Sequence, residues 1–179
     1  MRALLRLSKA IDTLNQKIGV IAIWLVLIAC VISAGNALMR YGFNLSSNAW
    51  LEIQWYLFAG MVMLGGAYTL ELNEHVRVDV LYSRYSGRTR VWVDLLGAIF
   101  FLLPMSVMIG WMSWPLFINS YDIGEISGNA GGLIRWPVKI LIPLGFLLLT
   151  LQGVSEIIKR IANLTGHLQL DSRYERPLQ

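Results

Sequence analysis

The ionisable side chains that could do chemistry are concentrated in one polar segment near the middle of the sequence. Within it, His75, Arg77 and Asp79 alternate with valines. This pattern suits an anchoring cluster, in which His75 or Arg77 meets Asp79 or the backbone of a partner. A second interpretation is a polar turn in which Asp79 caps a short helix, because a carboxylate there accepts hydrogen bonds from free backbone N–H groups. The residues alone leave both interpretations open.

Catalysis and cofactor binding have little support elsewhere in the sequence. A haem in a helical bundle needs axial ligands inside the helices, but both histidines, His75 and His167, are in polar segments. The scarcity of His and Cys also argues against a metal centre. The one cysteine, Cys30, lies in a long apolar run and is expected to be a small buried hydrophobe. No base is grouped with a Ser or Cys nucleophile, so we predict no enzymatic activity and no cofactor.

Four long stretches of the chain carry no charge, and they determine the predicted architecture. They hold 22, 18, 27 and 16 residues without Asp, Glu, Lys or Arg: residues 18–39, 53–70, 95–121 and 140–155. As a helix, the first is about 33 Å long, enough to cross a hydrocarbon core of about 30 Å. Lys139 and Glu156 close the fourth, and both can reach the headgroups from a helix end. We therefore predict an all-α membrane protein with four transmembrane helices.

Positive residues are divided unequally between the two predicted sides of the membrane. Twelve of the fifteen Lys and Arg fall beside the termini and in the middle loop, whereas Arg40, Arg135 and Lys139 fall on the other side. Because positive flanks stay cytoplasmic, we predict that both termini are inside. The basic balance then indicates contact with anionic membrane lipids. A nucleic-acid partner is not expected, since no soluble basic face is available.

The chain divides into three predicted parts. Residues 1–17 have Leu and Ile at intervals of three and four, with basic residues between them, which predicts an interfacial amphipathic helix in the headgroup plane. One long, tilted helix that continues into the membrane is the alternative. Residues 18–166 form the four-helix transmembrane domain, and residues 167–179 form a polar cytoplasmic tail. Pro104 is the expected kink of the third helix, since proline removes a backbone hydrogen bond.

Small residues recur on three of the predicted helices at spacings that favour close packing. They are Ala29, Ser33 and Ala37 on the first helix, Ser106 and Gly110 on the third, and Gly145 and Gly153 on the fourth. Small residues let helix backbones approach closely in lipid, where no hydrophobic effect drives packing. These faces could pack within the bundle or against another protein.

Independent transport has less support than association. A pump or exchanger needs an ionisable group deep in the membrane, or unwound half-helices that coordinate an ion. The four stretches contain no charged residue, and Glu52 and Glu71 lie at opposite ends of the second helix. We therefore expect any translocation to be carried out by a companion protein.

Two neighbouring runs of the sequence resemble the signature of the DctQ family, the small membrane subunits of tripartite ATP-independent periplasmic (TRAP) transporters. They are Gly65-Gly66-Ala67-Tyr68-Thr69-Leu70 and His75-Val76-Arg77-Val78-Asp79-Val80-Leu81. Glu52 at the start of the second helix and the Trp136-Pro137-Val138-Lys139 run before the fourth are similar too. The likeness covers most of the chain, and the four spans with both termini inside agree with this family.

The resemblance implies a scaffold function in a bacterial inner membrane. In such systems a periplasmic solute-binding protein (DctP-like) captures an organic anion, usually a carboxylate. A large permease subunit (DctM-like) then carries it inward, coupled to sodium entry, and the small subunit helps to form a static scaffold. Glu52, His75, Arg77 and Asp79 are then candidate partner contacts. The alternative is a self-sufficient, homo-oligomeric small transporter or channel.

Overall fold

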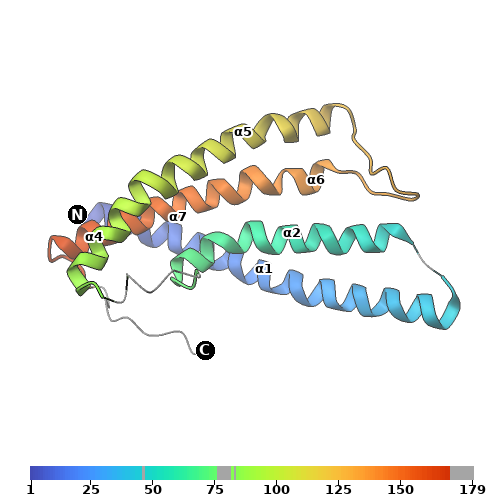
Figure 1. Ribbon diagram of the computed structural model, residues 1–179, viewed down its shortest axis with the longest axis horizontal. Helices are drawn as coiled ribbons and strands as arrows, with labels where there is room; N and C mark the ends of the chain where they lie inside the picture. Colours follow the sequence, from blue (N-terminus) through green and yellow to red (C-terminus); the bar gives the residue numbers. More distant parts are fainter. Residues whose placement is uncertain (46, 76–81, 83, 170–179) are drawn as a thin grey trace.

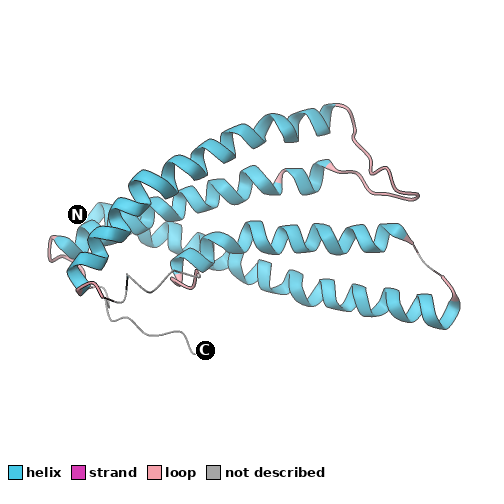
Figure 2. Cartoon of the chain, in the orientation of Figure 1, coloured by secondary structure: helices cyan, strands magenta, loops and turns pink. Residues whose placement is uncertain are grey.

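The computed structural model consists of helices joined by short loops (Figures 1 and 2). It describes residues 1–45, 47–75, 82 and 84–169. The elements are α1 (Arg2–Phe43), α2 (Asn48–Glu71), α4 (Gly87–Gly97), the π-helix η1 (Ala98–Leu102), α5 (Leu103–Asp122), α6 (Trp136–Lys139) and α7 (Leu141–Leu164). These described ranges contain no strand, only the isolated bridge between Ile126 and Ile134. The predicted all-α class is confirmed.

Three helical stretches of the described chain are long and apolar enough to cross a membrane. They are Arg2–Phe43, Gly87–Asp122 and Trp136–Leu164. α2 is another long helix, with 24 residues. The start of α1 and the end of α7 lie at the same end of the molecule, which we call the inner end (Figure 1). The loop between α5 and α6 projects at the opposite, outer end.

The first helix has no break near residue 17. α1 is continuous from Arg2 to Phe43, which is the alternative that the sequence left open. In its first half the side chains of Ser8, Ile11 and Asn15 are buried, whereas three leucines of the predicted apolar face, Leu4, Leu7 and Leu14, are 43–50% exposed. The basic residues of this segment, such as Lys9 and Lys17, stay exposed, so the side of α1 that packs on protein is a mixed polar and apolar one. The position of residues 1–17 in the headgroup plane stays a prediction.

α7 is the central helix of the fold. It packs against α1, α2 and α5, and α2 also packs along α1. Within its most apolar segment 39% of the residues are buried, compared with 11% for α1 and 17% for the stretch Gly87–Asp122. Because α5 has no comparable packing on α1 or α2, the helices form a broad arrangement around α7.

The third apolar stretch changes its helical pitch directly before Pro104. η1 occupies the preceding turn, and the N–H of Leu103 donates to the carbonyl oxygen of Ala98, five residues back. Proline has no N–H for the carbonyl four residues earlier, and its ring crowds that carbonyl. A widened turn accommodates both effects. The structure thus has a π-helical turn at this point, and the kink predicted at Pro104 stays a prediction.

Four of the predicted small packing residues lie between helices of this chain. A Cβ atom built on Gly145 would be 2.6 Å from the carbonyl oxygen of Met63, and one on Gly153 would be 3.1 Å from the Leu102 side chain. Gly110 is less crowded, since its Cβ would be 3.5 Å from that of Phe146. Ser106 is buried, and its hydroxyl accepts a hydrogen bond from Thr150 at 2.9 Å.

The small residues on the outer half of α1 have a different environment. Ser33 and Ala37 are exposed and Ala29 is half-buried. Cys30 is exposed as well, so its prediction as a buried residue was wrong. The reason is that this half of α1 lies beside α2 but extends away from α7 (Figure 1).

Candidate functional site

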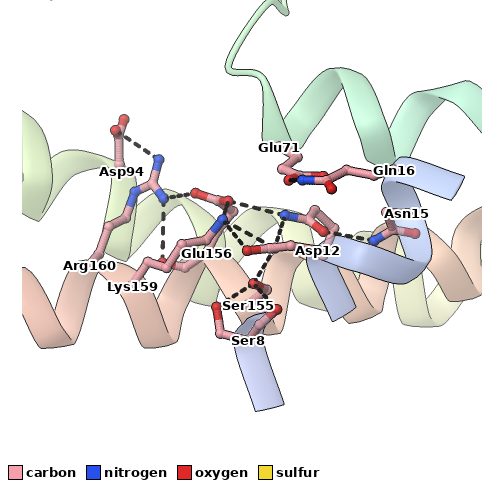
Figure 3. Close-up of polar contacts among 11 residues, drawn as sticks. Ser8, Asp12, Asn15, Gln16, Glu71, Asp94, Ser155, Glu156, Lys159 and Arg160 are labelled. Carbon is pink, nitrogen blue, oxygen red and sulfur yellow. Dashed lines mark hydrogen bonds and ion pairs between the residues drawn. The ribbon is translucent and has the colours of Figure 1, made fainter. Parts of the chain in front are cut away.

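Polar side chains from three helices meet at the inner end of the molecule (Figure 3). We call this set the inner polar cluster: Ser8, Asp12 and Asn15 of α1, Asp94 of α4, and Gln152, Ser155, Glu156, Lys159 and Arg160 of α7. On α1 and α7 these residues recur three or four positions apart. This spacing puts them on one face of each helix, so that the two faces can meet.

Asp12 is the main acceptor of the inner polar cluster. Its carboxylate accepts hydrogen bonds from the Ser155 hydroxyl at 2.7 Å, the Gln152 amide at 3.0 Å and the Lys159 ammonium at 3.2 Å. Lys159 also pairs with the charge of Asp12. One turn earlier on α1, the hydroxyls of Ser8 and Ser155 lie 2.7 Å apart. α1 is therefore joined to α7 by directional polar contacts.

Gln152 fixes the direction of the hydrogen bonds in the centre of the cluster. Its side chain is fully buried. Its amide nitrogen donates to two carboxylates, Asp12 at 3.0 Å and Glu156 at 3.2 Å. The amide oxygen must then accept, and it does so from Asn15 at 2.7 Å. Each bond thus requires the next, which makes the geometry of this junction specific.

The charged members of the cluster form a chain of alternating sign across three helices. Lys159 lies 3.2 Å from Asp12 and 2.5 Å from Glu156. Arg160 pairs with Glu156 and, at 3.2 Å, with Asp94 of α4. Alternation offsets the cost of removing each charge from water, because every charge has an opposite neighbour. A further bond of 2.5 Å, from Gln16 to Glu71, links α1 to the end of α2.

Sequence reasoning missed this cluster because it treated Glu156 as a charge that reaches from a helix end to the headgroups. The available signal was Gln152, which lies inside an uncharged stretch. A polar side chain in a spanning helix faces protein far more often than lipid. Asp12, Ser8 and Asn15, which share one helix face, were the complementary signal on α1.

A second set of polar contacts holds the outer loop, residues 123–135, against α2. Asn48, Glu52 and Tyr56 recur every four residues and share one face of α2. Asn48 donates to the carbonyl oxygen of Ala130 at 3.2 Å, and Tyr56 donates to that of Ile134 at 3.1 Å. The loop is itself ordered as a hairpin, in which the N–H of Ser127 donates to Leu133 at 2.9 Å.

Glu52 is the central residue of these loop contacts and is buried. Its carboxylate accepts hydrogen bonds from the backbone N–H of Leu133 and the side chain of Asn129, both at 2.7 Å, and from the Ser127 hydroxyl. The structure thus gives Glu52 a role within the chain. A direct contact with a partner stays a prediction.

An ion pair closes the base of the same loop. Glu125 bonds to Lys139 of α6, and this hydrogen bond is the main reason that the pKa of Glu125 is lowered. A carboxylate with a lowered pKa contributes stability above its ordinary pKa and loses it only as the pH falls through the lower value. The base of the loop is therefore expected to stay closed at mildly acidic pH.

The predicted polar cluster of the middle segment is only partly visible. His75 is exposed and lines a shallow groove between α1 and α2 together with Gly65 and Gly66. Arg77 and Asp79 lie outside the described residues, so the anchoring and capping interpretations both stay predictions. Within the described ranges no group of three or more His, Cys, Asp or Glu is placed to hold a metal ion.

Replacing Glu52 with alanine is expected to release the outer loop from α2. The change leaves the half-buried N–H of Leu133 without its acceptor, which costs about 1–3 kcal/mol for an unsatisfied group. It also removes the bond to Asn129, whose exposed amide can bond to water instead. Hydrogen exchange of residues 123–135 should rise at least tenfold. Gln54→Ala, two positions away on α2, is the matched control. Unchanged protection in Glu52→Ala would show that other contacts hold the loop.

The geometry defines a class of protein before any relative is considered. The described part of the chain is all-helical, three of its helical stretches can cross a membrane, and long stretches of its helices carry no charge. It is a multi-pass membrane protein. The model of the family described as tripartite ATP-independent periplasmic transporters, DctQ component, matches residues 28–163. The chain therefore belongs to the DctQ family of small TRAP transporter permease subunits, as its sequence signature predicted.

Two curated relatives agree with this assignment. A putative TRAP transporter small permease protein of Haemophilus influenzae is 25% identical over 122 residues, which cover 67% of this chain and 74% of the relative. The C4-dicarboxylate TRAP transporter small permease protein DctQ of Vibrio cholerae is 29% identical over 102 residues, or 54% of this chain and 44% of the relative. No solved structure matches the chain.

Proposed function

We propose that this subunit is the static scaffold on which a large DctM-like permease subunit moves an organic anion, coupled to sodium entry. A DctP-like periplasmic binding protein delivers the solute. The name of the Vibrio cholerae relative, which specifies C4-dicarboxylates, supports a carboxylate as the solute class. The scaffold itself needs no substrate site.

The observation that carries this proposal is the distribution of charge. Residues 18–39, 53–70, 95–121 and 140–155 contain no Asp, Glu, Lys, Arg or His. The buried charges at both ends already bind groups of this chain. At one end they pair within the inner polar cluster, and at the other Glu52 binds the outer loop. A transporter must bind and release its ion or solute at depth. This chain has no charged group there that could do so.

A static role is also consistent with the arrangement of the helices. A moving transport domain needs a broad fixed counterpart, since otherwise both parts would rotate together in the lipid. The packing around α7 is broad, because α5 contacts only one of the other long helices extensively. The inner polar cluster and the loop contacts then stiffen the two ends.

The proposed topology has four spans, with α2 as the fourth and both termini in the cytoplasm. The shared end of α1 and α7 requires an even number of crossings (Figure 1), and the excess of Lys and Arg at that end favours the cytoplasmic side. Fusing reporters after residue 179 and within the outer loop tests this topology. Green fluorescent protein should fluoresce only at the first site, and alkaline phosphatase should be active only at the second.

The exposed part of α1 offers a specific test of partner binding. Ser33→Leu should leave the isolated subunit folded, because Ser33 is exposed, but should lower the yield of its complex with the large subunit about tenfold or more if that face is the interface. Gly110→Leu is the contrasting variant, since Gly110 packs against Phe146 within the chain and its change should destabilise the subunit itself. Unaltered complex yield in Ser33→Leu would assign this face to lipid.

The decisive test of the scaffold function is purification in a mild detergent followed by reconstitution. A much larger multi-span protein should co-elute in near-equal amount. Vesicles that hold this subunit alone should show no sodium-dependent solute uptake, whereas vesicles with both subunits and the binding protein should show it. Flux through the isolated subunit would instead support the self-sufficient transporter or channel.

A further inference from the structure

A pocket opens at the inner end, between the start of α4 and the end of α7. Its volume of about 350 Å³ lies in the range of small-molecule sites, about 300–1,000 Å³. The residues that line it are Gly87, Arg88 and Val91 of α4, and Asn163, Leu164 and Gly166 at the end of α7. None of these residues belongs to the inner polar cluster.

The charge of this pocket is positive. Arg88 is exposed and has no ion pair or hydrogen bond to a side chain among the residues that the structure describes. Lys159 and Arg160, the cations of the neighbouring cluster, are both paired. The lining contains no carboxylate. The net charge of the lining is therefore positive, and it has no carboxylate that could pair with the ammonium group of a zwitterionic ligand.

The depth of the pocket matches the headgroup layer. Val91, in its wall, precedes Trp92, which is 47% exposed, and tryptophan is enriched at the level of the headgroups. Arg88 lies one turn closer to the water, about 5 Å further along the helix. Val91 and Leu164 thus provide an apolar wall at the edge of the hydrocarbon, and Arg88 provides a cation at the level of lipid phosphates.

We infer that this pocket binds the headgroup of an anionic phospholipid, with the Arg88 guanidinium paired to the phosphate. Basic pockets beside spanning helices are typical sites for such headgroups. The apolar wall distinguishes a lipid from free phosphate, because only a lipid has carbon chains to place against the half-buried Leu164 and the small exposed part of Val91. The inference does not depend on the scaffold function.

Native mass spectrometry of the full-length chain, released from nanodiscs with equal amounts of phosphatidylglycerol and phosphatidylcholine, tests this inference. One phosphatidylglycerol should be retained in preference to phosphatidylcholine. Arg88→Gln should lower this preference about fivefold, the contribution of one basic residue near an anionic surface. Arg88→Lys should keep most of it, because an ammonium also binds phosphate.

Arg6→Gln is the matched control, since it removes the same charge from an exposed position of α1 at the same end. It should change the preference less than twofold. Equal retention of both lipids, or equal effects of Arg6→Gln and Arg88→Gln, would overturn the inference. Displacement of the lipid by millimolar inorganic phosphate would also overturn it, since the site would then take the free anion. Circular dichroism should confirm that all variants are folded.

Discussion

Asp12→Ala is expected to lower the free energy of unfolding by about 3 kcal/mol, the larger of the two main stability effects. Removing one partner of a buried ion pair costs about 3–5 kcal/mol. The lower end of this range applies, because the side chains of Asp12 and Lys159 are 18% and 17% exposed. The variant also removes one of the two acceptors of the Gln152 amide nitrogen and the shorter bond of the Ser155 hydroxyl, which otherwise donates to the carbonyl oxygen of Ser8 at 3.3 Å. Tryptophan fluorescence during unfolding in mixed micelles measures the change.

Lys9→Ala is the control for this experiment, because Lys9 is exposed on the same helix and its change should stay within about 0.5 kcal/mol. A double-mutant cycle of Asp12→Ala with Lys159→Met separates their coupling from the other bonds. Equal stability of Asp12→Ala and Lys9→Ala would mean that the inner polar cluster does not hold α1 to α7. Broad apolar packing would then have to do so.

Gly145→Ala is expected to destabilise the subunit by about 1–3 kcal/mol, although it adds a single methyl group. The new Cβ would lie 2.6 Å from the carbonyl oxygen of Met63 and 3.0 Å from its carbonyl carbon. These are backbone atoms of α2, which no side-chain rotation can move. The whole of α2 must therefore shift away from α7, and contacts along both helices weaken.

Gly66→Ala provides a control with the opposite sign on the facing helix. A Cβ built on Gly66 meets no atom within 4 Å, so the change should stabilise α2 by about 0.5–1 kcal/mol through its helix propensity. The pair is measured on the isolated subunit by thermal unfolding in detergent. If both alanine variants shift the midpoint in the same direction, the close approach at Gly145 is not what limits the packing of α7.

Much of the fold followed from local sequence properties. The uncharged stretches predicted long helices, and Pro104, where a kink was predicted, directly follows a π-helical turn. These features depend on residues that are neighbours along one helix. The continuity of α1 through residue 17 was harder to decide, because the same spacing of leucines suits a surface helix and the lipid-facing side of a longer one.

The contacts within the candidate site were harder to predict from the sequence than the helices. Glu52 was selected as a partner contact, but its buried carboxylate binds a loop that begins more than 70 positions later. Gly110 and Gly145 looked alike as small residues in spanning helices. Only the distances to Phe146 and to the backbone of Met63 show that Gly110 is in ordinary contact and that Gly145 is crowded.

By itself the sequence determined that this protein belongs in a membrane and to the DctQ family. The cost of placing a charge in hydrocarbon acts on each residue separately, and a signature is read along the chain, so neither needs a known fold. Only the tertiary structure decided which polar groups meet. Asn15 and Gln152 are 137 positions apart, and their hydrogen bond exists because α1 and α7 cross at the inner end. Such pairing is a property of two helix faces together, which no single helix specifies.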